Sequence, residues 1–77
     1  MSKEATVLEE VLRRAMDEGL ALRDRGAGTE YDKGALMAYL TLLNWGKTQA
    51  ELLGVEFSDR ELQAFDPYEL LGKRKAA

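Results

Sequence analysis

The stretch from Lys33 to Gln49, KGALMAYLTLLNWGKTQ, decides the fold. It has no charged residue between Lys33 and Lys47, and its apolar residues fall on more than one side of a helix. A surface helix of a small protein usually has a single apolar stripe, which faces its own core. The stretch therefore predicts a helix that is covered twice, once by its own chain and once by another chain.

Two apolar stripes run along the helix that we expect over residues 30–53. Thr29 is a candidate N-cap with Asp32 three residues later, and Gly54 is a candidate C′ glycine. The first stripe consists of Leu36, Tyr39, Leu40, Leu43, Gly46 and Ala50. The second consists of Ala38, Leu42, Trp45 and Leu52, with Met37 near its edge. This helix is roughly 35 Å long at 1.5 Å per residue, so the second stripe needs an extended cover.

A preceding helix is expected over residues 3–25, with Ser2 or Thr6 as its cap. Its apolar stripe consists of Ala5, Leu8, Val11, Leu12, Ala15, Met16 and Leu22. Gly19 lies within this stripe, where it costs the helix about 1 kcal/mol relative to Ala, and it predicts close approach by another helix backbone. The short loop GAGT at 26–29 favours an antiparallel hairpin.

The C-terminal part predicts two short helices and a tail. Ser58 and Glu61 match a capping box for a helix over 59–65, and Asp66-Pro67 starts a turn over 67–71. Leu62, Phe65, Tyr68 and Leu71 are expected to cover part of the hairpin, and KRKAA at 73–77 is expected to be a flexible basic tail. The predicted fold class is all-α: an antiparallel two-helix hairpin plus one or two short C-terminal helices in a single domain, residues 1–77. Two copies are expected to pair into a dimeric four-helix arrangement.

Composition argues against several classes of function. The 77 residues include no Cys and no His, so zinc sites built from these residues and Ser–His or Cys–His catalysis are excluded. The carboxylate pairs Glu9/Glu10 and Asp59/Glu61 are interpreted as solvated helix faces, and we expect neither enzymatic activity nor a cofactor. The charge-free run is shorter than the roughly 20 residues of a membrane-spanning helix. With no signal-peptide pattern at the start, a cytoplasmic protein is expected.

Two short motifs offer other interpretations. Thr48–Phe65 resembles a helix-turn-helix, with Ala50 and Gly54 at the crossing and turn, so a DNA-binding regulator is the alternative function. The net charge of −3 and the acids beside Arg60 argue against nucleic acid as the partner. DPYELLG at 66–72 resembles the opening of a J-domain, the co-chaperone module, but the His-Pro-Asp loop of that family needs a histidine that this chain lacks.

The second stripe supplies the functional hypothesis. Trp is enriched among interface hot spots, and an apolar face left in water is an aggregation risk. The sequence therefore predicts a non-enzymatic protein-interaction module that acts as a homodimer. It is expected to bind a larger protein and to modulate or inhibit it, as bacterial and phage inhibitors or adaptors do. The candidate interface residues are Met37, Ala38, Tyr39, Leu42, Trp45 and Leu52.

Overall fold

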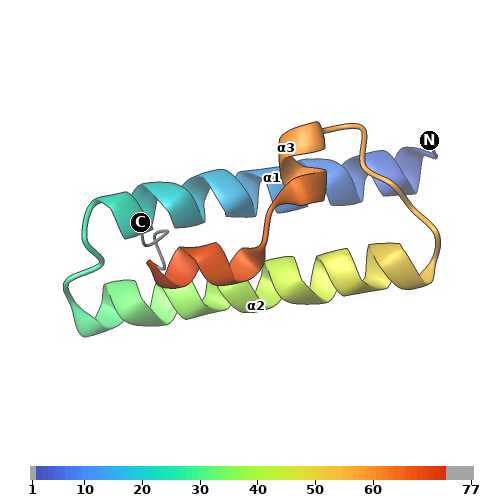
Figure 1. Cartoon of the computed structure of the whole chain (residues 1–77). Coiled ribbons are helices and arrows are strands. Elements are labelled where there is room, and N and C mark those ends of the chain that lie inside the picture. The colour runs from blue at the N-terminus through green and yellow to red at the C-terminus, as the bar shows by residue number, and fades with distance from the viewer. Residues whose placement is uncertain (1, 73–77) are drawn as a thin grey trace.

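The computed structural model describes residues 2–72 (Figure 1). Two long helices, α1 (Lys3–Asp24) and α2 (Glu30–Leu52), lie side by side and antiparallel. A short helix, α3 (Arg60–Ala64), and a 3-10 helix, η1 (Pro67–Leu71), fold back over one face of this hairpin. The predicted all-α hairpin with short C-terminal helices is confirmed, and residues 2–72 contain no strand. The expected basic tail at 73–77 lies outside the described residues.

Local capping explains where the long helices begin. The hydroxyl oxygen of Ser2 accepts a hydrogen bond from the Ala5 amide (3.1 Å), and that of Thr29 accepts one from the Asp32 amide (3.0 Å). Each bond satisfies an amide that has no partner within the first helical turn. Thr6, the other candidate cap of α1, instead donates its hydroxyl to the Ser2 carbonyl (3.0 Å).

The turn between the long helices needs left-handed backbone. Gly26 has φ 105° and Ala27 has φ 42°, while Gly54 has φ 72° just beyond the end of α2. Glycine adopts such angles without the steric cost that a Cβ atom brings. These residues end the two long helices and reverse the chain after each of them.

The core lies between the hairpin and the returning C-terminal segment. Its buried residues are Leu12, Ala15, Met16, Leu22, Leu36, Leu40, Leu43, Ala50, Phe57, Leu62 and Leu70. The first stripe predicted on α2 accordingly faces this core, with Tyr39 partly buried against it. Val11 lies at the edge of the α1 stripe and is 47% exposed, so it is not part of the buried core.

The C-terminal segment buries residues other than those predicted. Tyr68 and Leu71 were expected against the hairpin, but both are exposed, whereas Pro67 and Leu70 are buried. The chain is extended at Phe65 and Asp66, which resets the helical phase, and η1 then has three residues per turn. Pro67 and Leu70, three residues apart, therefore share its inner side.

The close contact at Gly19 also differs from expectation. A Cβ atom there would lie 2.9 Å from Leu70 Cδ1 and 3.4 Å from Tyr39 Cβ. The neighbour that uses the space is thus mainly the side chain of Leu70 in η1 and not the backbone of another helix. Gly19 allows η1 to settle between α1 and α2.

Candidate interaction surface

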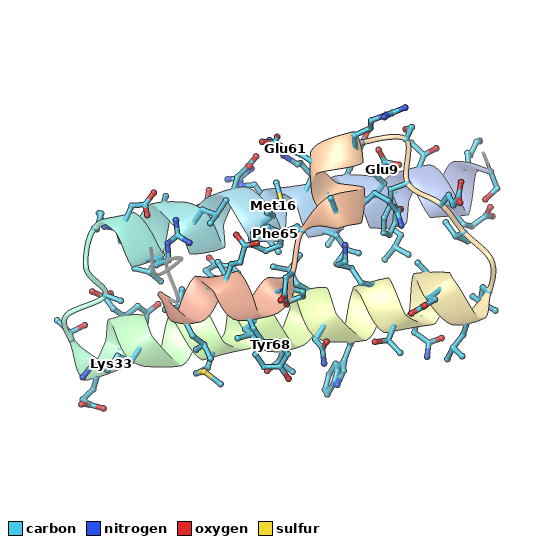
Figure 2. All side chains as sticks on the ribbon, in the orientation of Figure 1. Glu9, Met16, Lys33, Glu61, Phe65 and Tyr68 are labelled. Atoms are coloured by element: carbon cyan, nitrogen blue, oxygen red, sulfur yellow. The ribbon has the colours of Figure 1, made fainter. Side chains whose placement is uncertain are left out.

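A carboxylate on α1 holds the start of α3. Glu9 accepts hydrogen bonds from the Ser58 amide (3.0 Å), the Ser58 hydroxyl (3.0 Å) and the Asp59 amide (3.0 Å). Figure 2 shows Glu9 on α1 near the place where α3, marked by Glu61, crosses it. Ser58 was predicted to cap α3, but the cap is Asp59, whose carboxylate accepts from the Leu62 amide (3.1 Å). Ser58 is occupied by the long-range contact instead.

Arg13 adds ion pairs to the same junction. Its guanidinium donates to Asp59 (2.9 Å), to Asp17 on its own helix (3.1 Å), and lies 2.9 Å from a Glu61 oxygen. These carboxylates, Asp17 first, raise the pKa of Arg13. The pKa of Asp59 lies below its usual range because the Leu62 amide and Arg13 stabilise its charged form. Asp59 and Glu61 thus both bind Arg13 at this structural junction.

Two further cationic side chains, one on each long helix, donate hydrogen bonds to the C-terminal segment. Lys47 on α2 donates its amino group to the carbonyls of Leu62 and Gln63 (2.9 Å to Gln63) at the end of α3. Arg23 on α1 donates to the Glu69 carbonyl in η1 (3.0 Å). Burial lowers the pKa of the Lys47 amino group. The C-terminal segment is therefore tied to both long helices and covers one face of the hairpin.

The second stripe of α2 remains uncovered. Trp45 is 68%, Leu52 72% and Leu42 42% exposed, and Ala38 is exposed as well. In Figure 1 no described element lies against α2 on the side away from α1. We call the surface formed by Tyr31, Ala38, Leu42, Trp45 and Leu52 the outer face of α2.

One of the predicted interface residues lies elsewhere, because Tyr39 is partly buried and packs against the core. Met37 is exposed and lies at the edge of the outer face, about 80° around α2 from Trp45 and on the opposite flank from Leu42. Tyr31, which sequence reasoning did not include, extends the outer face and is 83% exposed. Its spacing of seven residues before Ala38 was the signal that could have identified it.

An apolar groove adjoins the outer face. The open groove, of about 600 Å³, runs between α1 and α2 and is lined by Val7, Val11, Ala15, Tyr39 and Leu42. Glu10, Arg14 and Glu18 form its charged edge on α1. Leu42 belongs to both surfaces, so they form one continuous apolar region over the two long helices. Val7 and Val11 were not predicted to take part in it.

A second hollow, of about 690 Å³, lies between the end of α2 and the loop that follows. Lys47 lines it together with Asn44, Thr48, Glu51 and Gln63. The amino group of Lys47 is already bonded to two carbonyls, so it is not available as a base or nucleophile. Residues 2–72 also contain no group of three acidic side chains placed to hold a metal ion.

The segment that resembles a helix-turn-helix has a different geometry. α3 has five residues and packs against α1, whereas the second helix of that motif packs on the helix immediately before it. Asp59 caps α3 and Glu61 lies in its first turn, so two carboxylates stand at the end that a reading helix would turn toward DNA.

Comparison with known proteins gives no further identification. No protein-family model, no curated protein and no solved structure matches this chain. Among the described residues, no helix combines the length and the apolar character that crossing a membrane requires.

Proposed function

We propose that the protein is a small non-enzymatic interaction module that docks on another protein chain through the outer face of α2 and the open groove. The exposure of Trp45, with Leu42 and Leu52 beside it, is the observation that carries the proposal. Aromatic side chains dominate the energetics of many interfaces, and monomeric proteins rarely expose large contiguous apolar patches. The C-terminal segment is the only other covering material in residues 2–72, and its polar bonds hold it on another face.

Two adjoining surfaces suit a module with two kinds of contact. The outer face of α2 has the uncharged character of a surface that meets its own copy. The open groove has an apolar floor and a charged edge at Glu10, Arg14 and Glu18, as the rim of a site for a different protein would have. Occupying the surface of a larger protein in this way modulates or inhibits that protein.

The DNA-binding alternative has less support. Its candidate reading helix is short, carries Asp59 and Glu61 at its start, and is held against α1 by Glu9 and Arg13. Phosphate binding by a protein requires accessible cations, and Arg13 is paired with three carboxylates.

The test uses matched arginine substitutions at exposed apolar positions. Immobilised wild type, Trp45→Arg, Val11→Arg and Tyr68→Arg are compared for the proteins that they retain from an extract of the native host. The proposal expects a protein, or the chain itself, that is retained by wild type and by Tyr68→Arg on η1. Its retention should fall at least tenfold with Trp45→Arg or Val11→Arg, while circular dichroism shows unchanged helix content.

Identical sets of retained proteins for all four baits, together with a monomeric wild type, would contradict the proposal. Tyr68 is the matched control because it is aromatic and 53% exposed, yet it lies on the C-terminal segment.

A further inference from the structure

The outer face of α2 contains a heptad row. Tyr31, Ala38, Trp45 and Leu52 follow one another at intervals of seven residues, and all four are exposed. A helix keeps residues at this spacing nearly in line, with a drift of about 20° per heptad that supercoiling of two helices removes. Such a row is the seam along which one helix packs on another. The core stripe of α2 is on a different side, and these four residues belong neither to the buried core nor to the side chains packed against it.

The large and small side chains of this row are placed symmetrically about a point on α2, so that a large one on one side matches a smaller one on the other. Ala38 and Trp45 are equally far from the midpoint between Thr41 and Leu42, and so are Tyr31 and Leu52. A two-fold axis through that midpoint would place each Trp45 opposite the Ala38 of a second copy, and each Tyr31 opposite a Leu52. Large side chains then meet small or medium ones, which allows close packing. A parallel pairing would set Trp45 against Trp45 and leave a gap between the two Ala38 residues.

The charges on α2 permit two copies to meet. From Gly34 to Gly46 the helix has no charged residue. Lys47, the next cation, turns to the carbonyls of Leu62 and Gln63, away from the outer face. Over this central stretch, two identical faces can therefore approach without placing like charges opposite each other, which would be destabilising. The acids of α2 are Glu30, Asp32 and Glu51, and they lie toward its two ends.

The exposed aromatic residues of the outer face supply roughly a quarter to a half of the area that a standard dimer interface requires. An aromatic side chain buries roughly 150–250 Å², and Tyr31 and Trp45 are 83% and 68% exposed. These two residues alone thus supply roughly 200–400 Å² per copy. Leu42 and Leu52 add further exposed apolar area. A standard interface buries roughly 800 Å² per partner.

We infer that the outer face of α2 binds the same face of a second copy of this chain, with the two α2 helices antiparallel about an axis between Thr41 and Leu42. This inference rests on the proposed function and specifies the chain that occupies one of its two surfaces. The open groove of each copy then remains free for a different protein, because its floor at Val7 and Val11 belongs to α1.

Single-cysteine variants test the orientation, because the wild-type chain has no cysteine. Gly34→Cys and Thr48→Cys change exposed positions beside the row and leave its large side chains intact. In the antiparallel pairing, residue 34 of one copy lies close to residue 48 of the other. The two copies of residue 34, or of residue 48, are then roughly 20 Å apart along the helix axis. In a parallel pairing the opposite holds, and each variant lies close to itself.

The experiment treats each variant alone and an equal mixture of the two with a short bismaleimide that spans less than 10 Å. The inference expects covalent dimer in the mixture, at several times the yield that either variant gives alone. Light scattering should show the mass of a dimer for wild type and for both cysteine variants, and of a monomer for Trp45→Arg. Asp24→Cys, on α1, is the control for random collision.

Strong cross-linking of each variant alone, without a gain in the mixture, would overturn the antiparallel arrangement. A wild type that scatters as a monomer at several hundred micromolar would overturn self-association itself. In that second case, continued loss of a captured protein with Trp45→Arg would leave the proposed function standing, so the two failures are distinguishable.

Discussion

Gly46 on α2 lies directly against the side chain of Leu12 on α1. A Cβ atom at Gly46 would be 2.6 Å from Leu12 Cδ2, 2.7 Å from Cδ1 and 3.1 Å from Cγ. Leu12 is fully buried in the core, so its side chain has little space into which it can move. This contact brings the two long helices together at the middle of the hairpin, about 100° around α2 from the adjacent Trp45.

Gly46→Ala should therefore destabilise the protein. Overpacking of a filled core costs about 1–3 kcal/mol, and the better helix propensity of Ala returns up to about 1 kcal/mol. We expect a net loss of roughly 1–2 kcal/mol in the free energy of unfolding, measured by urea denaturation. Gly34→Ala is the matched control in the same helix, because nothing lies within 4 Å of its added Cβ, and it should be neutral or slightly stabilising. Equal effects at the two glycines would contradict the contact.

Gly19→Leu should displace η1 from the hairpin. The added side chain would enter the space that Leu70 occupies, and we expect a loss of about 1–3 kcal/mol through overpacking. Hydrogen exchange should show that protection is lost first in residues 65–72, while the amides of α1 and α2 stay protected. A uniform loss of protection over the whole chain would indicate that η1 is not the element displaced.

The parts of the fold that depend on near neighbours could be predicted from the sequence. Thr29 caps α2 by accepting from an amide three residues later, and Asp66 caps η1 by accepting from an amide two residues later. Each capping signal therefore lies within a few neighbouring residues of the sequence. The two stripes of α2 were equally readable, because helical spacing alone separates Leu43 from Trp45.

The rest depended on contacts between distant segments. The sequence did not show which side of η1 faces the core, because the extended residues Phe65 and Asp66 interrupt the helical periodicity. Leu71 was therefore predicted to be buried, whereas the buried residue is Leu70. Phe57 lies in a loop and its side chain is buried in the core, but a loop has no periodicity from which this burial could be predicted. The open groove was not predicted, because its apolar floor combines Val11 of α1 with Leu42 of α2. The pattern of one helix alone does not show which residues of the other helix lie beside it.

Asp59→Asn should lower stability at neutral pH and lose this effect in acid. The pKa of Asp59 is lowered in the folded protein by the Leu62 amide and by Arg13, so the folded state binds the proton less tightly than the unfolded state. The stabilisation is complete above the ordinary carboxyl pKa of about 3.9 and is lost as the pH falls through the lower folded value. The urea midpoints of wild type and Asp59→Asn should therefore differ at pH 7 and converge below pH 3. A difference that stays constant with pH would contradict this role.

Lys47→Met should loosen α3 without disturbing the hairpin. The substitution keeps an apolar stem but removes the amino group that bonds the carbonyls of Leu62 and Gln63. Because the partly buried amino group also has a desolvation cost, we expect a net loss of only about 1 kcal/mol, with faster proteolysis after residue 55. Lys33→Met is the control, since the ion pair of Lys33 with Glu30 is exposed and 3.9 Å long, and it should change stability by less than about 0.5 kcal/mol. Similar proteolysis rates of the two variants would contradict a role of Lys47 in holding α3 against α2.

The fluorescence of Trp45 should report occupation of the outer face of α2. Trp45 is the only tryptophan in the chain and is 68% exposed, so the isolated protein should emit as a solvated indole. When a second copy covers Trp45, its emission should move to shorter wavelength and iodide should quench it less, in step with rising protein concentration. Leu42→Arg keeps the tryptophan but places a charge within the same face, and it should abolish this concentration dependence, whereas Tyr68→Arg on η1 should leave it unchanged. A red-shifted, fully quenchable emission at every concentration would mean that no second copy reaches this face.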